Sequence, residues 1–397
     1  MRVLICIVFA LAAFTTWDSR FVAAQELFAA ERANPFPDDR DRMRGWRVKQ
    51  ELFGASSLGF IDVLPRNVPR KGSIVLRLND GDVVVNGREF DSRSGRDRAW
   101  SGNLPGDVEG SFFVSMRGQN VFALLRRNGG LIYICPDGFG GHLILRIDDW
   151  RKYVDHRLES IQEILRNSRT LRGPRVRFTR SYSIKVHVVY TPAVAAVEPD
   201  IEGYVQSLIQ ATNLSFSNSG IGAGISQASG SPRMTQYQEG SDPMDAIVKL
   251  YSPTDGFMDE VLTDRDDTAA DIVILLAKRP TNQWCGLSMR SPATSDTAFS
   301  IVNYACGLTN LSFAHEIGHQ FGADHDIGWF TNGDTAPYPF GHGFVDAQRP
   351  AKSVMGVSCE SCLRLDRWSV PPGFGVSGVS ENVKVMNMNA PTIAGFR

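Results

Sequence analysis

Three of the seven histidines in this 397-residue chain lie in one short segment, HEIGHQFGADH, which runs from His315 to His325. The second histidine, His319, follows the first by four residues. Residues four apart lie on one face of an α-helix, so their imidazoles can bind the same zinc ion at about 2.0–2.1 Å. Three histidines, a glutamate and a glycine at these positions would occur by chance in this chain with a probability on the order of 10⁻⁵. The segment therefore predicts a zinc site.

A straight helix cannot bring the third histidine to that ion. At 1.5 Å per residue, His325 would lie about 9 Å beyond His319. Gly322 stands between them, and glycine adopts a positive φ without a steric penalty, which allows a helix to end sharply. We therefore expect two ligands on a helix, a turn at Gly322, and His325 returning to the metal as the third ligand.

Three neutral imidazoles leave the zinc ion its full charge and one open coordination position, as in catalytic rather than structural sites. Water bound there has its pKa lowered toward 7, and the ion also polarises a carbonyl group. Glu316 follows the first histidine directly and is placed to accept the proton of the water as a general base. The predicted chemistry is hydrolysis without a covalent intermediate.

The segment from His315 to His325 resembles the signature HExxHxxGxxH of the metzincin metallopeptidases and matches it at every specified position. Asp326, directly after the third histidine, resembles the reprolysin, or adamalysin, branch of that family. Metzincins also carry a supporting methionine turn beneath the zinc ion, and Met355 in the sequence Ser-Val-Met-Gly matches this turn. The resemblance extends over residues 182–397.

The resemblance implies a zinc endopeptidase with a catalytic domain at residues 181–397. This domain would have the zincin fold, an α/β (α+β) arrangement with a twisted mixed sheet and a zinc-binding active-site helix. The strand before Cys306 would be the antiparallel edge strand, beside which an extended peptide can dock. The N-terminal half is similar, more weakly, to reprolysin propeptides. We therefore expect a zymogen whose own propeptide acts as inhibitor, and a monomeric enzyme.

The pattern of the second half agrees with a sheet that has helices packed on it. Strands and helices alternate after Tyr182, and one apolar run is continuous enough for a buried strand. We expect strands at residues 184–190, 234–238, 271–277 and 298–303, and helices at residues 201–216 and 245–251.

The N-terminus has the pattern of a secretory signal. Arg2 precedes an apolar run over residues 3–14, and small residues lie just before Gln25. A membrane anchor would need roughly 20 apolar residues, and Asp18 interrupts the run. We expect residues 1–24 to be removed and the product to be secreted into the extracellular space, where cysteines can oxidise.

Residues 25–165 are predicted to be a β-rich propeptide. Short apolar runs alternate there with turn signals such as Asn79-Asp80-Gly81, and a helix is expected at residues 150–165. Residues 166–180 follow as a basic linker with six arginines around Gly173-Pro174. Exposed basic linkers are cut by proteases, so this segment is the expected processing site. A solvated charged face is the alternative interpretation of the same composition.

Five cysteines remain once the signal is removed. Four of them allow three pairings, and the spacing favours Cys285 with Cys306 and Cys359 with Cys362. A second zinc site at Cys359 and Cys362 is the alternative, although a second pair at similar spacing is missing. Cys135 has no obvious partner. It is either a buried core residue or a latency ligand whose thiolate would occupy the open zinc position.

Charge and composition disfavour nucleic acid and membranes as partners, and the resemblance implies polypeptide substrates. With 42 Lys+Arg against 43 Asp+Glu, the chain has no strong field for nucleic acid or an anionic membrane. After the signal no segment is apolar and long enough to span a membrane. Two other functions compete: an inactive metzincin-like adhesion or decoy module, and a hydrolase of a non-peptide bond. Inactive relatives typically lose the glutamate or a ligand, and this chain retains all four residues.

Overall fold

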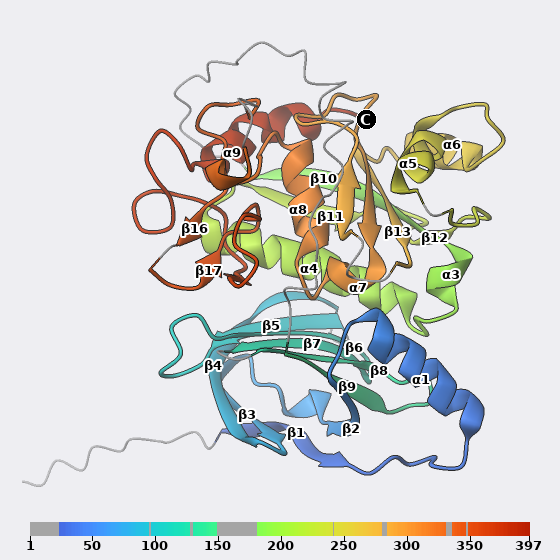
Figure 1. The fold of residues 1–397 in the computed structure, drawn as a ribbon, viewed down its shortest axis with the longest axis vertical. Coiled ribbons are helices and arrows are strands. Elements are labelled where there is room, and N and C mark those ends of the chain that lie inside the picture. The colour runs from blue at the N-terminus through green and yellow to red at the C-terminus, as the bar shows by residue number, and fades with distance from the viewer. Residues whose placement is uncertain are drawn as a thin grey trace, which may run out of the picture.

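The chain folds into two units that follow one another in sequence (Figure 1). We call residues 24–148 the barrel unit and residues 181–397 the C-terminal unit. The predicted signal except Ala24, the helix expected at residues 150–165 and the processing linker at residues 166–180 lie outside the described residues. The computed structural model describes residues 24–94, 97–127, 130–148, 181–240, 242–279, 284–330, 336–346 and 348–397.

The barrel unit consists of one sheet that closes on itself, together with one helix and a 3₁₀ turn. Its elements are β1 (Gln25–Arg32), α1 (Arg40–Leu52), β2 (Ser57–Val63), η1 (Pro65–Asn67), β3 (Lys71–Leu78), β4 (Gly81–Ser94), β5 (Asp97–Asn103), β6 (Ser111–Arg117), β7 (Asn120–Arg127), β8 (Gly130–Pro136) and β9 (His142–Ile147). The strand order is β1-β2-β9-β8-β7-β6-β5-β4-β3, and the barrel closes where β1 and β3 pair in parallel. The predicted turn before Gly81 is confirmed as the hairpin between β3 and β4.

Alternate residues of the barrel strands serve two different cores, because successive side chains of a strand point to opposite faces. Val114 of β6 and Ile134 of β8 belong to an apolar cluster made of barrel residues alone. Phe113, which precedes Val114, and Cys135, which follows Ile134, belong to a cluster shared with the C-terminal unit. Strand β8 is consequently buried along its whole length.

The C-terminal unit is a mixed sheet in the order β11-β10-β13-β15-β14, with β12 beside β10. Its strands are β10 (Tyr182–Tyr190), β11 (Ala223–Gln227), β12 (Arg233–Met234), β13 (Ile272–Ala277), β14 (Gly286–Ser288) and β15 (Phe299–Asn303). The strands pair in parallel except β14, which is antiparallel to β15.

The edge strand of the sheet is a different strand from the one expected from the sequence. The strand before Cys306 is β15, and it is flanked by β13 and β14 rather than lying at the edge. The antiparallel edge strand is β14, which pairs with β15 through three residues only. A segment that short, with the sequence Gly-Leu-Ser, has no strand pattern that a sequence reading can detect. The strand expected at residues 234–238 is likewise shorter and earlier, at Arg233–Met234.

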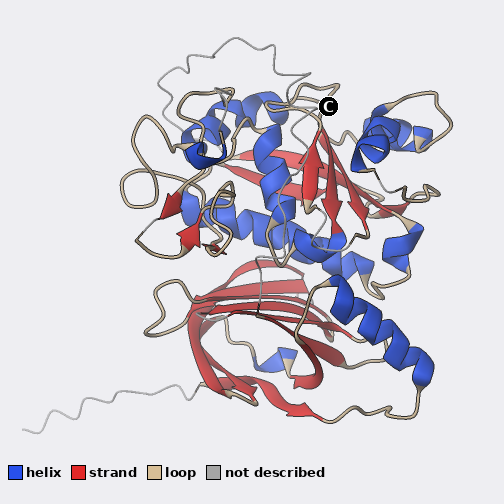
Figure 2. Ribbon diagram, in the orientation of Figure 1, coloured by secondary structure: helices blue, strands red, loops and turns tan. Residues whose placement is uncertain are grey.

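Helices cover both faces of this sheet (Figure 2). Ile274 of β13 packs in the cluster that contains α4 and α8, whereas its neighbour Leu275 packs in the cluster that contains α5 and α6. Among the described residues no helix is both long and apolar enough to cross a membrane. The helices are α3 (Pro192–Ala195), α4 (Ile201–Ser219), α5 (Pro243–Tyr251), α6 (Asp259–Asp267), α7 (Tyr304–Gly307), α8 (Ser312–Gln320), η3 (Ile327–Trp329) and α9 (Asn382–Ile393).

A small sheet and two disulfides complete the unit. Strands β16 (Val345–Asp346), β17 (Ala351–Lys352) and β18 (Leu363–Arg364) pair in that order. The disulfides join Cys285 to Cys306 and Cys359 to Cys362, as the spacing predicted. The alternative of a second zinc site at Cys359 and Cys362 is therefore wrong, since both sulfur atoms are bonded to each other.

Candidate metal centre

The three histidines of the motif converge on one point. Nε2 of His325 lies 3.2 Å from Nε2 of His315 and 3.2 Å from Nε2 of His319. All three side chains are buried, and their ligand atoms lie within 4.8 Å of one another. Tetrahedral ligands about 2.0–2.1 Å from a zinc ion are about 3.3 Å apart, so this spacing suits one zinc ion.

The other ring nitrogen of each helical histidine is held by a backbone carbonyl. Nδ1 of His315 lies 2.8 Å from the carbonyl oxygen of Val354, and Nδ1 of His319 lies 3.1 Å from that of Ala323. A carbonyl only accepts hydrogen bonds, so both Nδ1 atoms carry the proton and donate it. Each Nε2 is then left with its lone pair facing the cluster. This tautomer is the one that binds a metal, and the donor set fits zinc.

The helix that carries the first two histidines ends at a glycine turn. Gly322 has φ of 88°. Its N–H donates to the carbonyl of His319 at 2.9 Å, and the N–H of Ala323 donates to the carbonyl of Gly318 at 3.0 Å. This pair of bonds is a Schellman arrangement, which requires the positive φ that glycine adopts most easily. A Cβ at position 322 would also lie 2.9 Å from Cε2 of Tyr338.

Glu316 faces the edge strand. Oγ of Ser288 in β14 donates to Oε2 of Glu316 at 2.7 Å, and the glutamate is fully buried. A Cβ at Gly286, on the same strand, would lie 2.7 Å from Cγ of Glu316. Only glycine at position 286 lets β14 approach the helix this closely. The carboxylate is thus held between the zinc helix and the strand that forms the open edge of the sheet.

Met355 lies directly beneath α8. Its side chain is fully buried, and a Cβ at Gly318 would lie 2.7 Å from its Sδ and 2.6 Å from Cζ3 of Trp368. Gly318 therefore allows the helix to approach both side chains. Val354, the residue before Met355, has its carbonyl oxygen 2.8 Å from Nδ1 of His315, so this segment contacts a histidine of the motif directly as well as packing beneath the helix.

Asp326 fixes the loop that follows this turn. Its Oδ1 accepts hydrogen bonds from the N–H of Val357 at 2.6 Å and of Ser358 at 3.0 Å. Asp326, the residue after the third histidine, therefore joins His325 to the loop beyond Met355. His342 also contacts the third histidine, since its Nδ1 lies 3.0 Å from the carbonyl oxygen of His325.

Comparison with known proteins decides the family. The model of Metallo-peptidase family M12 (Reprolysin_5) matches residues 180–358. A peptidyl-Asp metalloendopeptidase from Stenotrophomonas maltophilia (strain R551-3) is 30% identical over 354 residues, which cover 85% of this chain and 82% of the relative. The chain belongs to the M12 metallopeptidase family. Another peptidyl-Asp metalloendopeptidase, from Xanthomonas campestris, is 27% identical and covers 83% of each chain. The crystal structure of metalloproteinase-II from Bacteroides fragilis has a TM-score of 0.43, is 13% identical, and covers 79% of this chain and 90% of that chain.

This M12 metallopeptidase is a zinc-dependent metalloendopeptidase of the metzincin type, and its C-terminal unit is a zincin-like mixed α/β domain. The expectations of a hydrolase, a zinc cofactor and polypeptide substrates are confirmed. The motif and the resemblance that it carries are sufficient to predict these properties, since the zinc signature is contiguous in sequence.

For Cys135 the sequence left two alternatives open. The structure places it in β8, fully buried beside Lys49 of α1, and not in the histidine cluster. Burial raises the pKa of its thiol to about 11, although Lys49 opposes this shift. The thiol is therefore protonated at neutral pH, whereas a zinc ligand must be a thiolate. Of the two alternatives that the sequence left open, the structure favours the buried core residue.

Sequence reasoning missed two residues of the metallopeptidase site. Ser288 and Gly286 contact Glu316 across 28 and 30 residues of chain, and neither stands in the zinc motif. The signal that was available is their place directly after Cys285, whose disulfide to Cys306 brings this segment next to β15 and the start of the zinc helix.

Proposed function

We propose that this metallopeptidase is a secreted endopeptidase made as a zymogen, in which His315, His319 and His325 hold the zinc ion and Glu316 is the general base. The observation that carries the proposal is the convergence of three histidine side chains, two of which share their helix with the buried Glu316. A zinc ion bound there supplies a Lewis acid that polarises the scissile carbonyl and lowers the pKa of water.

The residues of the chain then have separate tasks. Glu316 takes the proton of the attacking water and delivers it to the leaving amine. Ser288 holds the carboxylate in position through its hydrogen bond to Oε2, and Val354 and Ala323 keep the two helical imidazoles in the required tautomer. An extended substrate adds to the open edge of β14, which bears Ser288.

The substrate that we propose is a polypeptide cleaved at aspartate. The relatives from Stenotrophomonas and Xanthomonas carry the name peptidyl-Asp metalloendopeptidase. In this chain two buried basic side chains support the same preference. Lys352 and Arg364 are register partners in the small sheet, and Arg364 donates to the carbonyl of Gly356, the residue after Met355, at 2.9 Å. A positive charge next to the methionine turn favours an acidic side chain at the cleaved bond.

The zymogen proposal follows the order of segments along the chain. Residues 1–24 would be removed on export, and a cut within residues 166–180 would break the covalent connection between the barrel unit and the C-terminal unit. We propose that the intact precursor is less active than the cut protein. Inhibition through a thiolate of Cys135 is not part of this proposal, since that side chain is buried against Lys49.

One substitution tests the catalytic proposal. Glu316→Gln retains all three imidazoles and removes the base, so zinc content measured by mass spectrometry should equal that of the wild type. Cleavage of an aspartate-containing peptide should fall by at least about 10²-fold. A zinc-loaded Glu316→Gln protein with wild-type turnover would exclude Glu316 as the base. A wild-type protein that binds zinc and cleaves no peptide would favour the inactive adhesion or decoy module.

A further inference from the structure

The barrel unit packs against one face of the C-terminal unit, formed by the turn between α3 and α4, by α4 itself and by α7 (Figure 1). Phe53 lies edge-on to Tyr304 at 5.4 Å between ring centroids, and Phe122 lies edge-on to Tyr204 at 5.9 Å. All four rings are at least 99% buried. A Cβ at Gly203 would lie 2.9 Å from Cε2 of Phe122, so the glycine lets the barrel contact α4 directly.

A buried ion pair lies at the centre of this contact. Nζ of Lys49 in α1 is 3.1 Å from Oε2 of Glu198, and these side chains are 4% and 0% exposed. The hydroxyl of Tyr304 donates to the same oxygen at 2.6 Å, and the N–H of Asp200 donates to Oε1 at 3.0 Å. Burial opposes the charge on Lys49, but Cys135 and Glu198 outweigh it and raise the pKa of the lysine. The contact of Lys49 with Glu198 is thus enclosed between the two units rather than exposed at their rim.

A second acidic residue of the same turn is bound at the rim. Oδ1 of Asp200 lies 3.1 Å from Nη1 of Arg117, and Oδ2 accepts from Nδ2 of Asn120 at 2.6 Å. The arginine is 45% exposed, so this pair contributes less than the buried one. Glu198 and Asp200, two acidic residues of one turn of the C-terminal unit, are thus both bound by polar groups of the barrel.

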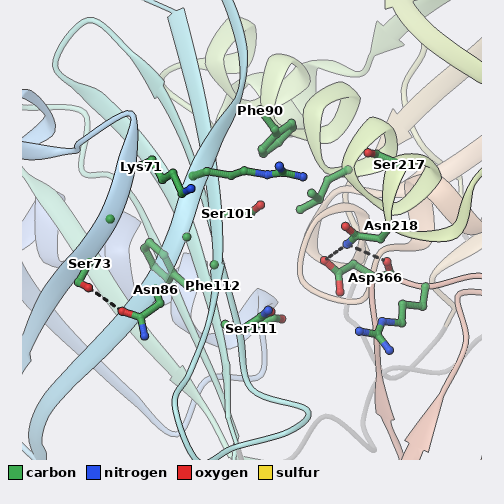
Figure 3. A pocket seen from close by; sticks show the side chains of 17 residues that line it. Lys71, Ser73, Asn86, Phe90, Ser101, Ser111, Phe112, Ser217, Asn218 and Asp366 are labelled. Carbon is green, nitrogen blue, oxygen red and sulfur yellow. Dashed lines mark hydrogen bonds between the residues drawn. The ribbon is translucent and has the colours of Figure 1, made fainter.

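The opposite end of the contact is open and polar. A cavity of about 590 Å³ lies there between barrel strands and the end of α4, with Lys71, Ser101, Ser217 and Asn218 among its lining residues (Figure 3). Asn218 donates to Asp366 within the C-terminal unit rather than to the barrel. The closely packed end of the interface between the two units is therefore the end that contains Lys49.

We infer that the barrel unit is a lasting partner of the C-terminal unit, held by the contact of Lys49 with Glu198, and that it stays bound after the linker is cut. A cut between residues 166 and 180 breaks none of the contacts described above. Loss of the barrel would expose Tyr204 and Tyr304 and leave Glu198 without its cation. Permanent interfaces are more hydrophobic than transient ones and resemble the interior of a domain, as this buried aromatic contact does.

The retained barrel also supports the catalytic side. Tyr304, which bonds Glu198, begins α7, and α7 contains Cys306. The disulfide from Cys306 reaches Cys285, directly before the edge strand that holds Glu316. The barrel unit thus contacts α7, the helix to which the edge strand β14 is joined by the disulfide. This inference concerns binding between the two units and does not depend on the proposed peptidase mechanism.

The test uses the full chain with a site for a sequence-specific protease inserted between Gly173 and Pro174. The Glu316→Gln substitution is included so that self-cleavage does not contribute. After cutting, size-exclusion chromatography and native mass spectrometry at decreasing protein concentration give the dissociation constant of the two fragments. We expect the wild-type interface to keep both fragments together at micromolar concentration. Separation of the fragments at that concentration would overturn the inference.

Matched substitutions identify the anchor. Lys49→Met should raise the dissociation constant by roughly 100-fold or more, because it leaves the buried carboxylate without its cation. Lys71→Met makes the same change at the cavity end of the interface and should leave the constant within about threefold. Glu198→Gln changes the same ion pair from the C-terminal unit and should also weaken binding. It replaces Lys49→Met in the test if that variant does not fold. Equal constants for Glu198→Gln and Lys71→Met would exclude the ion pair as the anchor.

Discussion

Oγ of Ser288 on the edge strand lies 2.7 Å from Oε2 of Glu316 on α8, and this hydrogen bond joins the open edge of the sheet to the proposed base. Ser288 also lies 2.8 Å from Oγ of Ser300 on β15. The position of the carboxylate therefore depends on a strand that is only three residues long.

Ser288→Ala should lower kcat by about 10–100-fold with little change in zinc content. A hydrogen bond to a charged group contributes about 1.5–3 kcal/mol, and its loss leaves Glu316 less well oriented. Ser300→Ala removes a neighbouring hydroxyl that bonds Ser288, and it should have a smaller effect. Steady-state kinetics of both variants on one peptide measure the difference. Equal losses would mean that the effect comes from general packing of the sheet.

Gly322→Ala should weaken zinc binding by roughly 10–100-fold, because the third ligand reaches the site only through this turn. Alanine at φ of 88° costs about 1–2 kcal/mol, and its Cβ would lie 2.9 Å from Tyr338. Gly378→Ala is the control, since Gly378 has φ of 77° with no atom within 4 Å of the added Cβ. Zinc titration by competition with a chelator should separate the two variants, even if both lose similar stability.

The convergence of the three histidines and the mixed α/β fold of the C-terminal unit could be predicted because their information is local. The motif is contiguous, Gly322 carries its own conformational preference, and the apolar run of β13 marks a buried strand. Ser288 and Gly286 could not be predicted, because their roles arise only when β14 pairs with β15 beside α8. Lys49 was missed for the same reason: its partner Glu198 lies 149 residues away.

His142 should make the stability of the chain depend on pH. Burial lowers the pKa of this histidine to about 4, and its Nε2 accepts a hydrogen bond from the N–H of Val121 at 3.0 Å. Between pH 6.5 and 4 the unfolded chain binds a proton that the folded chain does not, so the free energy of unfolding falls as pH falls. The expected loss is about 3 kcal/mol over this range, from a shift of about 2.5 pKa units at 1.36 kcal/mol each.

The test compares thermal unfolding of the wild type and His142→Gln at pH 7 and pH 5. Glutamine can still accept from Val121 but does not titrate, so the variant should lose less stability on acidification. Burial lowers the pKa of His187 and His342 as well, and these contributions remain in both proteins. An identical loss in the two proteins would show that His142 is not a source of the acid sensitivity.

N-terminal sequencing of the secreted protein checks the processing boundary. The basic linker predicts a C-terminal fragment that begins between residues 166 and 181, just before β10 starts at Tyr182. Strand β10 lies in the middle of the sheet and pairs with β11, β12 and β13, so a cut inside it would disrupt the fold. A fragment that begins after Tyr190, or well before Arg166, would contradict the boundary.

Arg364 should set a preference for aspartate at the cleaved bond. Its guanidinium donates to the carbonyl of Asn310, which precedes α8, at 3.0 Å and to that of Gly356, which follows Met355, at 2.9 Å. The charge therefore lies between the start of the zinc helix and the methionine turn. Arg364→Gln should lower the ratio of kcat/KM for an aspartate peptide to that for the matching asparagine peptide by about 10-fold or more.

The ratio is the informative quantity because a partly unfolded variant loses activity equally on both peptides. Arg349→Gln is the control: this arginine lies near the same small sheet, is 48% exposed and is paired with Asp346, so the ratio should stay within about twofold. Arg364→Lys keeps the charge and should keep most of the preference while losing some stability. If Arg364→Gln leaves the ratio unchanged, the acidic side chain is recognised elsewhere, and Lys352→Met then tests the neighbouring cation of the same sheet.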